Sequence, residues 1–345
     1  MGFPYGTVTT LHSASDLREA REFIVRSGLA FEEGCDDFAG AYENGRLVGA
    51  GARAGNVLKM LTVEPSRQGG PLLGQIVTTL VNLAFAAGCD SLFVFTKPEH
   101  SVTFEALNFS LLASQRRVAL LEYGGGLERW LSSKRELVRP GRNGAVVANG
   151  NPFTLGHRYL IETAAGQVDH LYLFIVREDR SVFPFDVRYR LAREGVSGIP
   201  NVILLDTSHY AVSGATFPTY FLKKDDPVAR IQMELDAALF ASKIAPSFDI
   251  ATRFVGTEPY CAMTGSYNEA LKRILPVYGI GLCEVERKQD GGSAISASRV
   301  RELLAAGDLA AIGPLVPPAT FAYLRGREAG PAVESLRRRA EPILR

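Results

Sequence analysis

One stretch of the chain, residues 145–157, constrains the local fold more than any other. It opens with an apolar run at 145–148, which is long enough for one buried strand of a parallel sheet. Turn-forming residues follow at 149–152, and residues 158–162 then have the spacing of a helix. The first-turn N–H groups of a helix lack intrahelical partners, and the helix dipole favours negative charge there. This order of strand, turn and helix therefore predicts a phosphate-binding junction.

The junction carries a short signature, Thr154-x-Gly156-His157. It resembles the T/H-x-G-H signature of the nucleotidylyltransferases, which grips the α-phosphate of ATP. The resemblance implies that Gly156 lets the backbone approach the nucleotide closely. It also implies that His157 donates to α-phosphate oxygens while pyrophosphate is displaced. Thr154 stands where many members have a second histidine, so a neutral hydroxyl donor is expected there. The alternative is that His157 only caps a packed helix.

A second signature lies near the other end of the chain. Residues 295–299 read Ile-Ser-Ala-Ser-Arg and precede an amphipathic helical pattern with Ser at its cap. They resemble the superfamily's I-S-x-S-R motif. The resemblance implies that Ser296, Ser298 and Arg299 hold the β- and γ-phosphates, which leave as pyrophosphate. Since both signatures occur in order at the two ends of one α/β segment, they predict a single nucleotide site.

These motifs define the expected site. The expected catalytic residues are Thr154, His157 and Arg299. A further stretch, residues 256–261, follows a predicted strand end, where adenylyltransferases commonly place nucleotide contacts. The expected ATP-binding residues are Ala148, Asn149, Asn151, Pro152, Phe153, Gly156, Gly256, Glu258, Ile295, Ser296 and Ser298. No protein residue is expected to hold a metal. Mg²⁺ is expected to bridge the leaving phosphates, as it does in most ATP chemistry.

Composition narrows the class of protein. With 38 Lys and Arg against 37 Asp and Glu, the charge balance indicates neither a nucleic-acid nor a membrane partner. No apolar run approaches membrane-spanning length, and the N-terminus lacks a basic-then-apolar leader. The cysteines are scattered singly, without metal-ligand spacing, and are expected to be reduced. The cysteines are Cys35, Cys89, Cys261 and Cys283. Because reduced cysteines are typical of the cytoplasm, we expect a cytoplasmic protein.

The length of 345 residues predicts two domains. A polar, breaker-rich segment at 139–144 places the boundary, so domains of 1–138 and 139–345 are expected. In the second, strands alternate with helices, which predicts a doubly wound parallel sheet (Rossmann-like) with its ligand at the strands' carboxyl ends. The expected strands are 145–148, 171–176, 202–206, 252–256 and 281–287, and the expected helices include 185–196, 227–243 and 267–275.

The first domain contains a predicted hairpin that turns at Asn44-Gly45, and residues 63–70, before a predicted helix, read Val-Glu-Pro-Ser-Arg-Gln-Gly-Gly. That loop resembles the pyrophosphate-binding loop of the Gcn5-related N-acetyltransferases, in which backbone N–H groups cradle a CoA-like diphosphate. Leu72 replaces the family's usual Gly or Ala, and Pro71 removes one donor. An α/β acetyltransferase-like fold is expected. A scaffold without CoA binding is the alternative.

One more stretch, the aromatic and hydroxyl-rich residues 208–224, is too elaborate for a plain connection. Together with the two signatures it resembles the citrate lyase ligase family, which also joins an acetyltransferase-like domain to a nucleotidyltransferase-like one. The resemblance implies an acid–thiol ligase that activates acetate with ATP and acetylates the dephospho-CoA-derived thiol of the citrate lyase acyl carrier protein. The residues it implies for binding the acyl group or the carrier arm are Arg67, Gln68, Gly70, Thr216 and Lys223.

Two other functions remain open from the sequence. An ordinary adenylyltransferase acting on a phosphate ester, such as phosphopantetheine or a pyridine mononucleotide, would share both signatures. It would need basic residues for the acceptor phosphate, whereas acetate needs only a small polar pocket. The other function is a non-catalytic sensor that binds nucleotide and CoA.

Overall fold

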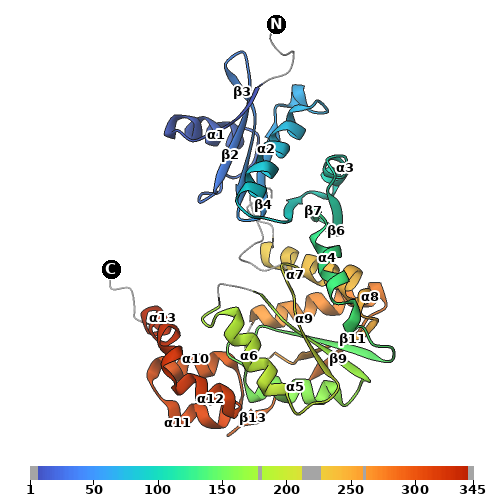
Figure 1. Cartoon of the computed structure of the whole chain (residues 1–345), viewed down its shortest axis with the longest axis vertical. Coiled ribbons are helices and arrows are strands. Elements are labelled where there is room, and N and C mark those ends of the chain that lie inside the picture. Colours follow the sequence, from blue (N-terminus) through green and yellow to red (C-terminus); the bar gives the residue numbers. More distant parts are fainter. Residues whose placement is uncertain (1–6, 178–180, 212–226, 259–261, 341–345) are drawn as a thin grey trace. The chain divides into compact units, whose positions relative to one another are not determined.

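The computed structural model describes residues 7–177, 181–211, 227–258 and 262–340. The chain divides into two compact units, each described here by itself (Figure 1). The first unit contains the described residues up to Ser132 together with 227–239. The second contains the described residues of 133–211 and 240–340. The structural division thus falls at Ser132, whereas the sequence placed the domain boundary after residue 138.

The first unit is built on a seven-stranded sheet in the order β1-β2-β3-β4-β5-β7-β6. Neighbouring strands are antiparallel except β4 and β5, which run parallel and pair over two residues of each strand. The hairpin between β2 and β3 turns at Asn44-Gly45 as predicted, and both residues have positive φ. The strands are β1 (Thr7–Thr10), β2 (Asp37–Glu43), β3 (Arg46–Ala54), β4 (Val57–Val63), β5 (Leu92–Thr96), β6 (Ser110–Gln115) and β7 (Val118–Tyr123).

Helices cover this sheet because its strands bury both faces. Alternate residues of β2 enter different cores: Ala39 and Ala41 pack with Ile76 of the long apolar helix, whereas Phe38 packs with Phe23 of the first helix. The helices are α1 (Ala14–Arg26), α2 (Leu72–Ala86), α3 (Ser101–Glu105), α4 (Gly126–Ser133) and α7 (Val228–Leu239), with short turns η1 (Pro65–Arg67) and η2 (Pro98–His100). Helix α7 packs against β6 and β7, which explains why it belongs to this unit.

The second unit is built on a five-stranded parallel sheet in the order β10-β9-β8-β11-β12. The chain starts at the central β8 and moves outward to one edge, then returns and builds the other edge. This order confirms the doubly wound α/β fold that the alternating pattern predicted. The strands are β8 (Asn143–Ala148), β9 (His170–Ile175), β10 (Val202–Asp206), β11 (Ile250–Gly256) and β12 (Gly281–Val285).

The helices of the second unit surround this sheet (Figure 1). One of its cores joins Ile161 and Leu191 to Phe254 on the sheet and to Val300 of the helix at 297–306. The main helices are α5 (Leu155–Ala165), α6 (Phe185–Val196), α9 (Ala262–Ile274), α10 (Ala297–Ala306), α11 (Leu309–Ile312), α12 (Pro318–Arg325) and α13 (Gly330–Ala340). Shorter elements are η3 (Arg135–Leu137), the π-helix η4 (Phe240–Ile244), α8 (Ala245–Ser247), η5 (Leu275–Tyr278), η6 (Gly313–Leu315), η7 (Arg327–Ala329) and a hairpin of β13 (Gln289–Asp290) and β14 (Ser293–Ala294).

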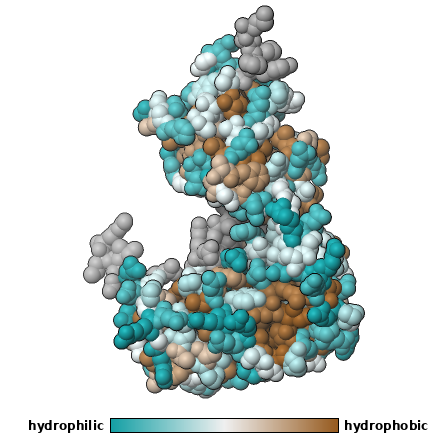
Figure 2. Space-filling view, viewed as in Figure 1, coloured by the Kyte–Doolittle hydropathy of each residue, from teal (hydrophilic) through white to brown (hydrophobic). Residues whose placement is uncertain are grey.

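The surface is mixed in polarity. Figure 2 shows a mostly hydrophilic face on which apolar residues gather in patches on each unit. The exposed large apolar side chains include Val25, Phe85, Val102, Tyr159, Val277 and Tyr278. Of the helices described, none combines the length and apolar character needed to span a bilayer.

Candidate active site

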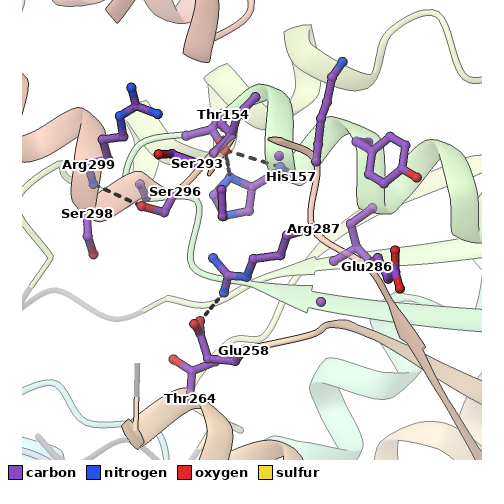
Figure 3. Close-up of a pocket in the computed structure, with 18 of the residues that line it drawn as sticks. Thr154, His157, Glu258, Thr264, Glu286, Arg287, Ser293, Ser296, Ser298 and Arg299 are labelled. Atoms are coloured by element: carbon purple, nitrogen blue, oxygen red, sulfur yellow. Dashed lines mark hydrogen bonds and ion pairs between the residues drawn. The ribbon is translucent and has the colours of Figure 1, made fainter. Parts of the chain in front are cut away.

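The second unit contains a cavity of about 880 Å³ at the carboxyl ends of β11 and β12. Its wall comes from the start of α5, the segments that follow β11 and β12, the β13–β14 hairpin and the start of α10 (Figure 3). Two helix N-termini therefore face one hollow. The structure brings together in this wall the predicted residues Thr154, Gly156, His157, Gly256, Glu258, Ile295, Ser296, Ser298 and Arg299.

Thr154 holds the His157 imidazole through a reciprocal cap at the start of α5. The Thr154 hydroxyl oxygen accepts a hydrogen bond from the His157 backbone N–H at 3.3 Å. In return, the Thr154 backbone N–H donates to Nδ1 of His157 at 3.0 Å, and the hydroxyl lies 2.9 Å from the same nitrogen. Because Nδ1 accepts a hydrogen bond, the proton of the neutral ring sits on Nε2. The cap thus leaves Nε2–H as the ring's donor.

The surroundings of His157 oppose its protonation. The ring stacks on Phe153, with centroids 5.4 Å apart and planes inclined by 23°, and Phe153 is fully buried. Burial, and to a lesser extent the positive charge of Arg287, lowers the pKa of His157 from 6.5 to about 4. At neutral pH the site therefore presents an uncharged hydrogen-bond donor.

Gly156 brings the two sequence signatures into contact. A Cβ added to Gly156 would lie 2.7 Å from the backbone carbonyl oxygen of Ile295, closer than such atoms normally approach. The backbone of Ile295 cannot move freely, because its N–H donates to the Lys288 carbonyl at 2.9 Å. In this structure the close approach that requires glycine is therefore between α5 and the segment before α10.

The start of α10 offers a cationic donor that lacks an acceptor. Ser296 caps the helix by accepting a hydrogen bond from the Arg299 backbone N–H at 3.1 Å. The Arg299 side chain has its Nη1 atom buried, with no hydrogen-bond partner in the part of the chain that the structure describes. A buried, unsatisfied donor costs roughly 1–3 kcal/mol, and more when the group is charged. An anionic oxygen in the cavity would remove that cost, so Arg299 fits a phosphate.

Five predicted nucleotide contacts do not line the cavity. Ala148 ends β8, and the side-chain oxygen of Asn149 accepts hydrogen bonds from the Ser181 hydroxyl at 3.1 Å and from Arg188 at 2.8 Å. The Asn151 side chain accepts the Phe183 backbone N–H at 3.1 Å. These contacts shape the loop after β8. The five residues are Ala148, Asn149, Asn151, Pro152 and Phe153.

Arg188 supports that loop, and the sequence analysis did not identify it. The side chain is fully buried on α6. Its Nη1 atom donates to the carbonyls of Asn149 at 2.8 Å and Val176 at 2.7 Å, and its Nε donates to Phe183 at 3.0 Å. A single arginine thereby ties the ends of β8 and β9 to the start of α6. In the sequence it is one polar residue of an amphipathic helix, with no signal that it is buried.

Two further residues that line the cavity, Arg287 and Lys288, were not predicted, although their position after a strand could have indicated them. Arg287 and Lys288 follow β12 just as Glu258 follows β11, and the ends of parallel neighbours meet at one edge of a sheet. Arg287 pairs with the Glu258 carboxylate, and its Nε donates to the Thr257 carbonyl at 2.6 Å. The remaining unpredicted lining residues include Tyr159, Leu160, Thr264, Glu286, Ser293 and Glu302.

Of the residues expected to bind the acyl group or the carrier arm, three lie in the described part of the first unit and two lie outside the described residues. In the first unit, Arg67 forms an ion pair with Glu43 at 2.6 Å, and Gln68 and Gly70 are exposed. Thr216 and Lys223 lie outside the described residues. Within the part of the chain that the structure describes, no group of three or more His, Cys, Asp or Glu side chains could hold a metal ion.

A solved structure offers a distant likeness. A Gcn5-related N-acetyltransferase from Rhodopseudomonas palustris aligns with 36% of this chain and 98% of its own, at 13% identity and a TM-score of 0.28. At this distance the likeness carries no inference about activity.

Sequence relatives are much closer. The family model of the citrate lyase ligase C-terminal domain matches residues 143–324, which hold both signatures. A citrate (pro-3S)-lyase ligase from Klebsiella pneumoniae is 42% identical over 317 residues, covering 89% of this chain and 92% of that protein. The ligase of the same name from Escherichia coli K12 is 38% identical over 317 residues, covering 90% of each. The chain therefore belongs to the citrate lyase ligase family.

Proposed function

We propose that this enzyme joins acetate to the thiol of the citrate lyase acyl carrier protein at the expense of ATP. In the first half-reaction an acetate oxygen bonds to the α-phosphorus, and the bond to pyrophosphate breaks. In the second, the carrier thiol attacks the carbonyl carbon of acetyl-AMP, AMP leaves, and the thiol proton passes to solvent. The products are acetyl-thioester, AMP and pyrophosphate, so no cysteine of this chain need be acylated.

One observation carries this proposal: the 880 Å³ cavity combines an unpartnered buried Arg299 nitrogen with a neutral His157 beside two helix N-termini. Those are the groups that a triphosphate undergoing displacement requires, because negative charge grows on the departing phosphates. The family relationship supports the proposed acceptor, since the relatives are named ligases of citrate lyase.

The protonation states suit a carboxylate nucleophile. Acetate is ionised at neutral pH, so its attack needs no general base. We assign the Nε2–H of His157 to an α-phosphate oxygen, where it stabilises charge without transferring a proton. We assign Arg299 and the first-turn N–H groups of α10 to the leaving phosphates. Thr154, whose side chain is engaged with His157, acts as a positioning residue.

Different groups would bind the nucleotide and the Mg²⁺ ion. The unsatisfied Arg299 nitrogen and the paired N-termini fit ATP. We assign Mg²⁺ to the leaving phosphates, because oxygen atoms are the ligands that this ion prefers. When bound there, the ion would neutralise part of the charge on the leaving group.

We assign the carrier's arm to the first unit. The carrier's prosthetic group is a dephospho-CoA derivative and so contains a diphosphate and a pantetheine arm. The 68–70 segment is exposed and precedes α2. Its sequence resembles, with departures at Pro71 and Leu72, the loop type that cradles such a diphosphate. Docking there would bring the thiol to acetyl-AMP, and proximity can contribute roughly 7–11 kcal/mol when geometry is fully set.

The test is a comparison of acceptors in the exchange of labelled pyrophosphate into ATP. We expect exchange with acetate, and none with phosphopantetheine or nicotinamide mononucleotide. Exchange that requires a phosphate ester instead of acetate would establish an ordinary adenylyltransferase. Tight nucleotide binding without exchange under any condition would establish a sensor.

A further inference from the structure

The register of the sheet places two charged residues side by side at the cavity. Gly256 at the end of β11 pairs with Val285 at the end of β12. The pairing continues past the strands, because the Thr257 N–H donates to the Val285 carbonyl at 2.9 Å. Glu258 and Arg287, each two residues past its strand, therefore meet and form an ion pair (Figure 3).

The two partners are buried to different extents. The Glu258 side chain is 4% exposed, whereas the Arg287 side chain is 25% exposed, and both residues line the cavity. The guanidinium is thus the more accessible of the two charged groups. An acidic group in a phosphate site would be repulsive by itself, and Arg287 cancels that charge.

The contacts of Arg287 leave part of its fork available. Its Nε donates to the Thr257 carbonyl at 2.6 Å, and its Nη2 contacts the Glu258 carboxylate. A guanidinium has five N–H groups in a planar fork, so these two contacts fix its orientation, and its Nη1 hydrogens have no partner among the described residues. Fixed orientation is what lets arginine recognise phosphate oxygens by two parallel hydrogen bonds.

Arg287 also lies close to the reacting end of the site. Figure 3 shows its side chain between His157 and Glu258, and its charge acts on the His157 imidazole. His157 is the residue assigned above to the α-phosphate, whereas Arg299 is assigned to the departing phosphates. The two arginines therefore serve different parts of the nucleotide.

We propose that Arg287 binds the α-phosphate of the nucleotide beside His157, and that Glu258 is its positioning residue and not a nucleotide ligand. This rests on the proposed function for the location of the nucleotide. Glu258 was expected from the sequence to contact ATP; here it acts on ATP only through Arg287.

Binding of three probes to the full-length protein, measured by calorimetry, tests the assignment. Adenosine has no phosphate, AMP has only the α-phosphate, and inorganic pyrophosphate represents the leaving group. Arg287→Met should weaken AMP binding on the order of ten- to a hundredfold, the effect of one hydrogen bond to a charged group. Adenosine lacks a phosphate, and pyrophosphate is assigned to Arg299, so neither probe should contact Arg287. The Arg287→Met protein should therefore bind both with an affinity within about twofold of wild type. Arg287→Lys should restore only part of the AMP affinity.

A loss of AMP binding must be distinguished from a loss of folding. Arg287→Met alone removes the ion pair that Arg287 forms with the buried Glu258 carboxylate, so the double variant Arg287→Met/Glu258→Gln is measured beside it. If Glu258 acts only through Arg287, the double variant should bind AMP no more weakly than Arg287→Met. Lys272→Met is the control, because Lys272 also pairs with an acid of β12, Glu284, but does not line the cavity. It should bind all three probes like wild type.

The outcomes separate this inference from the proposed function. If the folded double variant binds AMP as tightly as wild type does, the role of Arg287 is wrong. If Glu258→Gln in the presence of Arg287 leaves AMP affinity unchanged, the positioning role of Glu258 is wrong. If wild type binds AMP with the predicted arginine dependence but shows no acetate-dependent exchange, the acceptor assignment fails and the role of Arg287 stands.

Discussion

His157 enters the proposed reaction as a neutral donor, because Thr154 occupies its Nδ1 and burial opposes the imidazolium. We expect His157→Ala to lower the rate of acetate-dependent pyrophosphate exchange on the order of a hundred- to a thousandfold. That loss corresponds to about 2.7–4 kcal/mol for one preorganised donor. The control is His12→Ala, which removes an exposed histidine of the first unit. Exchange within threefold of wild type in a folded His157→Ala protein would refute the assignment.

The Thr154 hydroxyl is the part of the cap that a substitution can remove. Thr154→Val keeps the size of the side chain but removes the acceptor for the His157 N–H and the hydroxyl beside Nδ1. We expect the exchange rate to fall at least about tenfold and stability to fall by ~1 kcal/mol, the usual effect of a lost N-cap. Thr154→Ser retains the hydroxyl and should stay near wild type. Equal rates for the two variants would show that the hydroxyl does not position the ring.

The lowered pKa of His157 also predicts a pH dependence of stability. The unfolded chain binds a proton to this residue near pH 6.5, whereas the folded protein binds it only near pH 4. Its contribution is therefore complete above pH 6.5 and is lost as the pH falls toward 4. Urea unfolding at pH 7 and pH 5 should show a loss of up to about 2 kcal/mol, reduced where solvent reaches the half-buried ring. His157→Gln should lack this component; an unchanged pH dependence in that variant would contradict it.

At the scale of elements, the site depends on how closely α5 approaches the segment before α10. Gly156→Ala would place a Cβ 2.7 Å from the Ile295 carbonyl, so one of the two segments must shift. We expect a lower melting temperature and a large loss of exchange activity. Gly166→Ala, at the other end of α5, adds a Cβ whose nearest neighbour is 3.6 Å away. That control should retain both properties; equal behaviour of the two variants would mean that the contact is not limiting.

Most elements could be predicted because their signals are local. The breaker residues around 149–152 and the alternation of strands with helices located β8, α5 and the parallel sheet. The β6–β7 hairpin was not predicted, since its turn at Arg116-Arg117 has no glycine, asparagine or proline. The short β13–β14 hairpin was also missed, although Gly291-Gly292 lies at its turn.

The residues of the candidate site also divide into those that a local sequence pattern predicts and those that it does not. The residues of the two signatures line one cavity, because the sheet order brings the segments after β8 and β12 to the same edge. The loop residues from Ala148 to Phe153 turn instead toward Arg188 and the core. That difference depends on tertiary packing around a buried arginine, which no local pattern reveals.

At the scale of the whole molecule, the proposal divides one reaction between two units. Gly70→Phe places a bulky side chain in the exposed 68–70 segment of the first unit, beside the Arg67 carbonyl. We expect pyrophosphate exchange to stay within about twofold of wild type, since adenylation is assigned to the second unit. Acetylation of the carrier should fall at least about tenfold, because proximity of the thiol is lost.

The matched control for that prediction is Val102→Phe, which adds the same ring to a residue of α3 that is 72% exposed. It should leave both half-reactions unchanged. If Gly70→Phe acetylates the carrier at the wild-type rate, the 68–70 segment does not dock the arm and the first unit is a scaffold.

The central claim, that acetate is activated by bonding to the α-phosphate of ATP, can be tested by following its oxygen atoms. Acetate labelled with ¹⁸O in both carboxylate positions is turned over with ATP and the acyl carrier protein, and the products are examined by mass spectrometry. In an acetyl-AMP pathway the thiol breaks the acyl C–O bond, so the bridging oxygen stays on phosphorus. The account predicts one ¹⁸O atom in the phosphate of AMP and none in pyrophosphate. Unlabelled AMP, with the label in pyrophosphate or inorganic phosphate, would contradict it.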